Sequence, residues 1–194
     1  SDKTISNEEK DLYTDKILFN LRRMNELVHN VLLLSRVDNH SIEKKVNKFL
    51  LDEQIRQSIL FLESKWMEKN IEFDVDFETI NFIGNESLLI HVWNNLISNA
   101  IKFSPQNGII RMRLKQDSDW IIFIIEDDGP GVNEDAKKYI FNKFYQADTS
   151  HKEEGYGLGL ALVKRIIDIE NGHVEVENLY PKGCRFVVYL PKER

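Results

Sequence analysis

The sequence predicts an α+β fold, in which a mixed β-sheet is layered with helices and is preceded by one long helix. A repeat of apolar residues typical of a long packed helix runs through the first 36 residues. An unbroken apolar run at residues 120–125 is typical of a central strand. Further strand-like segments are interspersed with amphipathic helices, which favours a sheet with its helices on one face. We expect two parts, residues 1–40 and 41–194.

The long helix should begin near Ser6, which together with Glu9 forms a capping box. Its apolar residues recur at steps of four and three, as in the seam of a coiled coil or helical bundle: Ile17, Leu21, Met24, Val28 and Val31. Because one helix cannot bury such a face, we expect a partner from a second chain or from sequence outside this chain. The alternative is a helix that packs on its own globular domain. The pattern breaks at residues 36–44.

We expect the second part, residues 41–194, to consist of short helices and strands that alternate along the chain. Asp52 is expected to cap a helix whose apolar face runs from Ile55 to Trp66. A strong helix should end just before Pro105. The other expected helices lie near residues 134–144 and 157–170. The expected strands lie at residues 45–50, 71–77, 79–83, 110–114, 120–125, 173–178 and 184–190.

Composition narrows the function classes. The chain has 26 basic and 32 acidic residues and a net charge of −6, so a nucleic-acid partner is not expected. No segment has the roughly 18 consecutive apolar residues that cross a bilayer. Cys184 is the only cysteine, so no disulfide can form within the chain, and we expect it to be a small buried residue rather than a reactive thiol.

The expected helix at 85–103 carries a polar line beside its apolar face. Steps of four, four and three place these residues along one side: His91, Asn95, Asn99 and Lys102. Amide oxygens suit a hard cation such as Mg²⁺, and a lysine suits the phosphates that the cation bridges. A solvated polar face is the competing interpretation, and His91 in particular is expected to be an ordinary surface residue.

Two glycine-containing turns complete the pattern. Asp127, at the end of the apolar strand, is followed by Gly129 and Gly131, and its carboxylate could accept a hydrogen bond from an exocyclic amine. Residues 155–160 read Gly-Tyr-Gly-Leu-Gly-Leu at the start of a helix, where free amides bind phosphate. No Gly-Lys-Ser/Thr follows, so this is not a P-loop, and the spacing is wrong for a dinucleotide fingerprint.

Together these features resemble the catalytic domain of sensor histidine kinases, within the GHKL superfamily that also contains gyrase, Hsp90 and MutL. Residues 95–103 resemble the N box, 127–131 the G1 box, 140–145 the F box and 155–160 the G2 box. The helix ending at residues 32–36 resembles the second helix of the family's dimerisation and histidine-phosphotransfer domain. The resemblance implies a two-layer α/β sandwich of the Bergerat type that binds ATP and Mg²⁺.

The resemblance also implies residue roles. Asp127 would bind the adenine amino group, with Gly129 and Gly131 lining the base pocket and Tyr145 stacking on the base. Asn99 would ligate Mg²⁺ with Asn95 beside it, and Lys102 would contact phosphate. Asn95 and Lys102 would be the catalytic pair. Residues 146–158 would form a mobile ATP lid. The phosphates would be wrapped by the turn that contains Gly155, Gly157, Leu158 and Gly159.

Several positions depart from the family's pattern. Members that hydrolyse ATP carry a glutamate where this chain has Asn95, and an amide cannot act as a general base, which favours phosphoryl transfer over hydrolysis. Gln146 replaces a frequent lid arginine, for which Lys143, His151 or Lys152 are candidate substitutes. Glu154 replaces a glycine, and Cys184 replaces a threonine near the base. Two alternatives stay open: an anti-sigma-factor-type serine kinase and a non-catalytic nucleotide-binding signalling module.

The family's phosphoacceptor motif, His-Glu-x-x-Thr-Pro, is absent, so this chain is not expected to phosphorylate itself. His29 lacks the acidic neighbour and the proline of that motif. The resemblance implies a second copy of the protein as a partner through the dimerisation helix, and a response regulator receiver domain as another. It also implies the cytoplasmic portion of a bacterial inner- or plasma-membrane protein, whose membrane segments lie outside this sequence.

Overall fold

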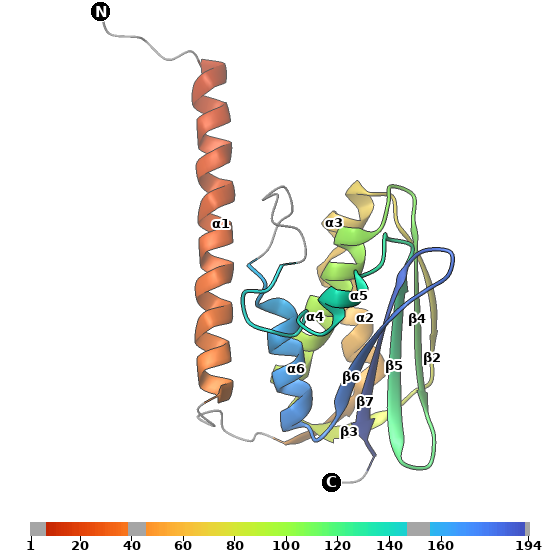
Figure 1. The fold of residues 1–194 in the computed structure, drawn as a ribbon. Coiled ribbons are helices and arrows are strands. Elements are labelled where there is room, and N and C mark those ends of the chain that lie inside the picture. Colours follow the sequence, from red (N-terminus) through yellow and green to blue (C-terminus); the bar gives the residue numbers. More distant parts are fainter. Residues whose placement is uncertain (1–6, 39–45, 147–155, 193–194) are drawn as a thin grey trace, which may run out of the picture.

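In the computed structural model, which describes residues 7–38, 46–146 and 156–192, helices cover one face of a five-stranded sheet. The sheet has the order β2-β4-β5-β7-β6, and a separate two-stranded sheet joins β1 to β3. In Figure 1 the helices α2, α4 and α6 lie on one side of the large sheet, and α1 stands alongside α6 and extends past the domain. The predicted α+β sandwich with a preceding long helix is confirmed.

The large sheet is mixed. Its strands are β2 (Glu72–Phe77), β4 (Ile109–Gln116), β5 (Trp120–Asp127), β6 (His173–Asn178) and β7 (Cys184–Pro191). β2 pairs with β4 in parallel, and every other pairing is antiparallel. The apolar strand β5 is the middle strand, as its sequence predicted, and its register places Asp127 opposite Cys184.

The helix α4 (Glu86–Phe103) is the central element of the helical layer. Trp93 is fully buried, its ring lies 5.0 Å from that of Phe123 on β5, and its indole nitrogen donates to Gln54 Oε1 at 2.8 Å. Truncation of such a side chain costs about 3–5 kcal/mol. Asn85 caps the first turn by accepting from the Leu88 amide at 3.2 Å. α4 is therefore held rigidly against the sheet.

A lysine stabilises the other end of α4. The Lys69 ammonium donates to the carbonyl oxygens of Ile101, Lys102 and Ser104 at 2.9, 2.6 and 3.0 Å. These carbonyls have no partner within the helix, and a cation also suits the negative end of the helix dipole. The segment that carries Asn99 and Lys102 is thereby fixed in place.

The remaining helices frame this centre. They are α1 (Asn7–Asp38), α2 (Leu51–Phe61), α3 (Glu63–Glu68), α5 (Glu134–Lys137) and α6 (Gly159–Ile169). The seam residues predicted on α1 are 41–59% exposed, whereas Leu34 and Val37 near its end are buried in the same core as the rest of the domain. The predicted capping box includes Ser6, which lies outside the described residues.

Three expectations about elements were wrong. Asp52 does not cap α2. It lies inside the first turn, and its carboxylate accepts from the Ile80 amide at 3.2 Å, tying the helix to the segment before β3 (Asn81–Gly84). The helix also breaks after Phe61, because the Ile59 carbonyl accepts from the Leu62 amide and the Trp66 indole instead of continuing the helical ladder.

The third concerns residues 134–144, where only the four residues of α5 are α-helical. Turns follow, and Phe144 takes a left-handed conformation with a φ of 63°. Its amide donates to the Gly157 carbonyl at 2.8 Å. A contact with a distant glycine thus replaces the helix that the local pattern predicted. The strand predicted at 45–50 is β1 (Asn47–Leu50).

Candidate functional site

The polar line predicted on α4 exists. His91, Asn95, Asn99 and Lys102 are half-buried, next to the buried residues of the same helix. The Asn95 amide nitrogen donates to the His91 carbonyl at 2.7 Å, which fixes the orientation of that side chain. The Lys102 ammonium lies 4.6 Å from the centre of the Phe103 ring. The face therefore presents amide groups and one cation in a fixed arrangement.

Gly159 lies directly against this face. A Cβ atom placed on it would fall 2.4 Å from Asn95 Oδ1, closer than any side chain tolerates. Gly159 is the first residue of α6, so the free amides at that helix start lie beside the polar line. The second glycine motif and the α4 motif are therefore in contact, although 64 positions separate Asn95 and Gly159 in the sequence.

Gly157 needs to be glycine for two reasons. Its φ is +68°, and a Cβ atom would lie 2.4 Å from the Tyr145 carbonyl oxygen. Leu158, between the two glycines, is buried, so its side chain belongs to the core and only its backbone can face a ligand. Gly155 and Glu154 lie outside the described residues. The Gly157–Gly159 turn is thus packed closely on two sides.

The acidic turn reaches the other end of α4. Asp127 is buried, and its Oδ1 accepts from the Gly129 amide at 2.9 Å. A Cβ atom on Gly129 would lie 2.8 Å from the Phe103 carbonyl oxygen, at the last residue of α4. The three motifs predicted from sequence therefore meet around the C-terminal half of one helix.

Gly131 has a φ of +80°, and the side chain of Asn178 lies against it. Asn178 Oδ1 accepts from the Val132 amide, and its Nδ2 donates to the Val132 carbonyl, both at 2.7 Å. Asn178 thus holds the glycine turn in place from β6. Sequence reasoning missed this residue, because nothing in its local pattern shows that it faces a turn 46 positions earlier.

The pKa values of the two adjacent carboxyl groups in this turn are shifted in opposite directions. Burial raises the pKa of Asp127 to about 6, against the opposing hydrogen bonds from the Gly129 and Cys184 backbone. Burial acts on Asp128 as well, but the Arg111 guanidinium at 2.9 Å and the Ile109 amide hold its pKa below the ordinary value. Asp127 is therefore a buried acceptor and Asp128 a surface ion-pair partner.

Cys184 lies opposite Asp127 on β7 and is buried. Burial, followed by the neighbouring Asp127 carboxylate, raises the pKa of its thiol to about 12. Since the thiolate is the reactive form, this residue is inert near neutral pH. The prediction of a small buried strand residue is confirmed.

Tyr145 lines a hollow of about 340 Å³ together with Asn133, Asp135, Ala136 and Tyr139. The rings of Tyr139 and Tyr145 lie 5.8 Å apart. This hollow adjoins the turn that Asn178 clamps, since Asn178 also donates to the Glu134 carboxylate at 2.9 Å. Tyr145 is thus an aromatic wall of a hollow that also includes Asn133, two residues after Gly131. Gln146, the next residue, is exposed.

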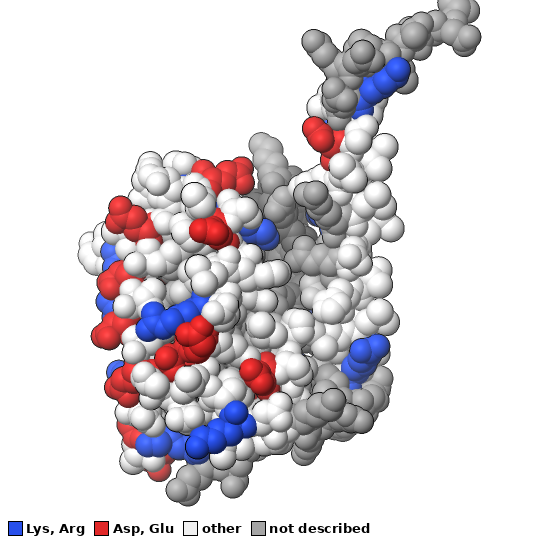
Figure 2. Space-filling model, turned by 180° about the vertical axis from the view of Figure 1, so that it is seen from behind, with Lys and Arg blue, Asp and Glu red and all other residues white. Residues whose placement is uncertain are grey.

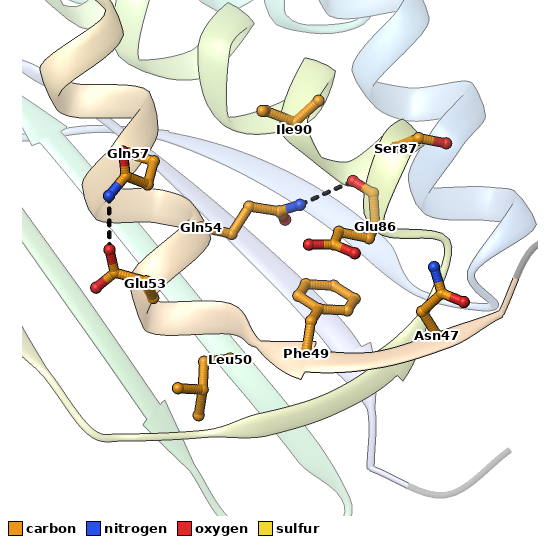
Figure 3. Close-up of a pocket in the computed structure, with 9 residues that line it drawn as sticks. All are labelled: Asn47, Phe49, Leu50, Glu53, Gln54, Gln57, Glu86, Ser87 and Ile90. Atoms are coloured by element: carbon orange, nitrogen blue, oxygen red, sulfur yellow. Dashed lines mark hydrogen bonds between the residues drawn. The ribbon is translucent and has the colours of Figure 1, made fainter.

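A larger hollow, about 490 Å³, contains none of the predicted site residues. It lies between β1, α2 and the first turns of α4 (Figure 3). Gln54 forms one wall and is held by donation to the Glu86 carbonyl at 2.7 Å and by the Trp93 indole. It is spatially separate from the half of α4 on which the motifs converge.

His91 is not the ordinary surface residue that was expected. It is half-buried, and its ring centre lies 5.7 Å from that of His29 on α1. Burial, and then the neighbouring His29, lower the pKa of His91. The long helix therefore contacts α4 one turn from Asn95. His173 begins the edge strand β6, and its ring stacks on that of Tyr189 at 4.2 Å. His40 and His151 lie outside the described residues.

The amide oxygens of α4 are of the type that a hard cation such as Mg²⁺ accepts. Within the described residues no three His, Cys, Asp or Glu side chains cluster as a metal centre. The buried Asn94 Oδ1, beside Asn95 on that helix, has no hydrogen-bond partner in the described chain. Mg²⁺ keeps most of its waters and accepts one protein oxygen alongside phosphate.

Surface charge shows no basic field on the face seen in Figure 2. Acidic and basic side chains intermingle over the body of the domain, and the visible surface of α1 is mostly uncharged. Among the described residues, no helix is both long enough and apolar enough to cross a membrane.

Comparison with known proteins assigns the family. Residues 84–194, more than half of the chain, match the family described as histidine kinase-, DNA gyrase B-, and HSP90-like ATPase. The chain belongs to this ATPase family. The matched region contains all three motifs that converge on α4, so the predicted ATP-binding domain of the sensor histidine kinase type is confirmed.

Curated relatives match most of this chain. The chain is 36% identical over 187 residues to the heme sensor protein HssS of Staphylococcus epidermidis, covering 96% of this chain and 40% of that protein. It is 31% identical over 174 residues to the circadian input-output histidine kinase CikA of Synechococcus elongatus, covering 87% of this chain and 23% of that protein. The chain thus spans well under half of the curated relatives it matches.

Solved structures agree. The mycobacterial sensor histidine kinase MprB has 30% identity and a TM-score of 0.66, covering 75% of this chain and 97% of that one. Full-length ShkA in complex with AMPPNP has 26% identity and a TM-score of 0.82, covering 97% of this chain and 40% of that one. The second match covers nearly all of this chain, so the long helix and the domain recur together in that structure.

Proposed function

We propose that this chain binds Mg-ATP and positions the γ-phosphate for transfer to a histidine on the full-length protein. The observation that carries the proposal is the convergence of the Asp127 turn and the Gly157–Gly159 turn on the polar line of α4. The Asp127 turn supplies a buried carboxylate, suited to a base, and the start of α6 supplies helix amides, suited to phosphate.

We assign the residue roles that the resemblance to sensor histidine kinases implies, and the environments described above support them. Asp127 accepts a hydrogen bond from the adenine amine, Gly129 and Gly131 let the base approach the backbone, and Tyr145 lies alongside it. Asn99 supplies the oxygen for Mg²⁺, which when bound neutralises phosphate charge. Lys102 adds a cation for the phosphates. The backbone of the Gly157–Gly159 turn faces the phosphates, and Gly155, which lies outside the described residues, is proposed to bind them as well.

The transfer is a displacement at phosphorus. The bond between the γ-phosphorus and the oxygen that bridges it to the β-phosphate breaks, a phosphorus–nitrogen bond to the acceptor imidazole forms, and ADP leaves. The chain contributes position and charge rather than covalent chemistry. The amide of Asn95 cannot act as a general base toward water, and its nitrogen already donates a hydrogen bond to the His91 carbonyl oxygen. Both points support transfer over hydrolysis.

The partners and location are part of this proposal. The exposed seam of α1 suits a second copy of the protein, and the phosphohistidine would be read by a response regulator receiver domain. We place the domain at the cytoplasmic side of a bacterial membrane, joined to it by segments outside this sequence. The boundary between a helix of residues 1–40 and a catalytic domain of residues 41–194 belongs to the same proposal.

Phosphotransfer tests the function. The chain is incubated with γ-labelled ATP, Mg²⁺ and a separate polypeptide that carries a helix with the His-Glu-x-x-Thr-Pro acceptor motif. We expect label on the acceptor that is labile in acid and stable in alkali, as phosphohistidine is, and none with an acceptor whose histidine is alanine. Acid-stable label would indicate the serine kinase instead. Saturable nucleotide binding with no transfer would indicate a non-catalytic nucleotide module.

A further inference from the structure

The end of the long helix is built into the catalytic domain. Leu34 and Val37 on the last turns of α1 are buried, and the helix ends at Asp38. In Figure 1 this end of α1 stands beside α6, the helix that begins at Gly159. The end of α1 therefore contacts α6, the helix that begins within one of the glycine motifs.

The Asp38 carboxylate is shared by two cations of the domain. Its Oδ2 lies 2.6 Å from the Lys143 ammonium, and its Oδ1 lies 3.3 Å from the Arg165 Nε. The Arg165 Nε is buried and has no hydrogen-bond partner in the described chain, so the Asp38 carboxylate is the anion that compensates it. One side chain of α1 thus joins two separate segments of the domain.

These two segments meet at the Gly157–Gly159 turn. Lys143 precedes Phe144, whose amide donates to the Gly157 carbonyl at 2.8 Å. Arg165 lies on α6, whose first residue is Gly159. Fixing Lys143 and Arg165 relative to each other therefore fixes the two sides of the turn.

A second contact from α1 reaches the same turn. The Arg23 guanidinium lies 5.2 Å from the centre of the Tyr156 ring, next to Gly157, and 5.7 Å from the Phe19 ring of its own helix. Such cation–π contacts are individually weak. Arg23 and Asp38 are about four turns apart on α1, so the helix holds the turn at two points.

We propose that Asp38 is a positioning residue for nucleotide binding, acting through Lys143 and Arg165 on the Gly157–Gly159 turn. This inference rests on the proposed role of that turn in holding phosphate. The orientation of the long helix is then coupled to the geometry of the nucleotide site through one carboxylate. A movement of α1 that withdraws Asp38 releases both cations together and loosens the turn.

The expected effect is modest, because all three side chains are between a third and a half exposed. Asp38→Asn should weaken binding of AMP-PNP with Mg²⁺ about two- to five-fold, the range of partly exposed ion pairs. It should also shift the amide NMR resonances of Gly157 and Gly159 in the nucleotide-free chain. Asp38→Glu should restore both properties. Asp15→Asn, which removes an exposed carboxylate elsewhere on the same helix, should change neither.

A double-mutant cycle distinguishes loss of the ion pairs from a general loss of folding. Asp38→Asn should weaken binding less in a Lys143→Met background than in the wild type, because one of the two pairs is already lost. Thermal unfolding of each variant verifies that the chain folds.

The proposal is overturned if Asp38→Asn leaves both resonances and the affinity at wild-type values, if Asp15→Asn causes the same change, or if Asp38→Glu fails to restore them. If the wild-type chain binds no nucleotide, the proposed function is wrong, whether or not Asp38 positions the turn. The amide resonances then decide the positioning claim: their shift in Asp38→Asn upholds it and their constancy overturns it.

Discussion

The backbone of Gly159 lies so close to the side chain of Asn95 that a Cβ atom on the glycine would fall 2.4 Å from the asparagine oxygen. This contact joins the glycine turn at the start of α6 to the polar line of α4. It explains why a residue without a side chain is needed there, and it places the free amides of α6 beside the amides of α4.

Gly159→Ala should therefore damage both stability and binding. Because the added methyl meets a fixed side chain, we expect the free energy of unfolding to fall by about 1–3 kcal/mol, as in other overpacked sites. Urea unfolding measures it. The double variant Asn95→Ala/Gly159→Ala removes the obstructing oxygen and should recover part of the loss. An equal or larger loss in the double variant would show that this contact is not the cause.

Asp127→Asn should make the nucleotide-free chain more stable at neutral pH. The pKa of Asp127 is about 6 in the folded chain, against an ordinary 3.8. Between these values the unfolded chain releases the proton while the folded chain keeps it, so stability is full below about pH 4 and is lost as pH rises through 6. The cost above pH 6 is about 3 kcal/mol.

Urea unfolding of both proteins from pH 4 to 7.5 measures this cost. The wild type should lose stability across the window relative to Asp127→Asn, and the two should converge near pH 4. Asp128→Asn is the matched control. Since the pKa of Asp128 is lowered by its Arg111 partner, its removal should destabilise the chain at neutral pH, by less than about 1 kcal/mol. Parallel curves for wild type and Asp127→Asn would contradict the account.

Nucleotide should change the titration of Asp127 itself. The carboxyl carbon resonance of Asp127 should titrate with a midpoint near pH 6 in the free chain. A hydrogen bond from the adenine amine favours the charged form, so AMP-PNP at saturation should move the midpoint lower. The same midpoint with and without bound nucleotide would place the base elsewhere.

Lys69→Met should loosen the end of α4 without touching the nucleotide. The ammonium makes three hydrogen bonds to helix-end carbonyls, and we expect its loss to cost about 1–3 kcal/mol of stability. Amide hydrogen exchange should increase at residues 100–104 more than at residues 88–92. Lys65→Met, a change at a nearby exposed lysine, should have little effect. Uniform acceleration along α4 would point to global destabilisation instead.

Leu21→Glu should reduce self-association. Leu21 is 55% exposed on the apolar seam of α1, a position that a second copy of the helix would cover. Sedimentation equilibrium should show a weaker dimer for this variant than for Leu60→Glu, which alters an equally exposed leucine on α2. Equal effects from both changes would indicate non-specific association.

Local patterns predicted α4 and the central strand well. The spacing of apolar residues distinguishes a helix that buries one face from a strand that buries both faces. They also singled out Asp127, Asn95 and Gly159 as candidate site residues, because each belongs to a local motif. They failed at Asp52 and at residues 134–144, where contacts with Ile80 and Gly157 outweigh local preference. The clamps made by Asn178 and Asp38 join residues 46 and 105 positions away, which no local pattern encodes.

Calorimetric titration with AMP-PNP, with and without Mg²⁺, tests the central claim most directly. We expect saturable binding that Mg²⁺ strengthens, that Asp127→Asn abolishes and that the adjacent Asp128→Asn retains. Binding that survives in Asp127→Asn, or is absent from the folded wild-type chain, would contradict the nucleotide site described above.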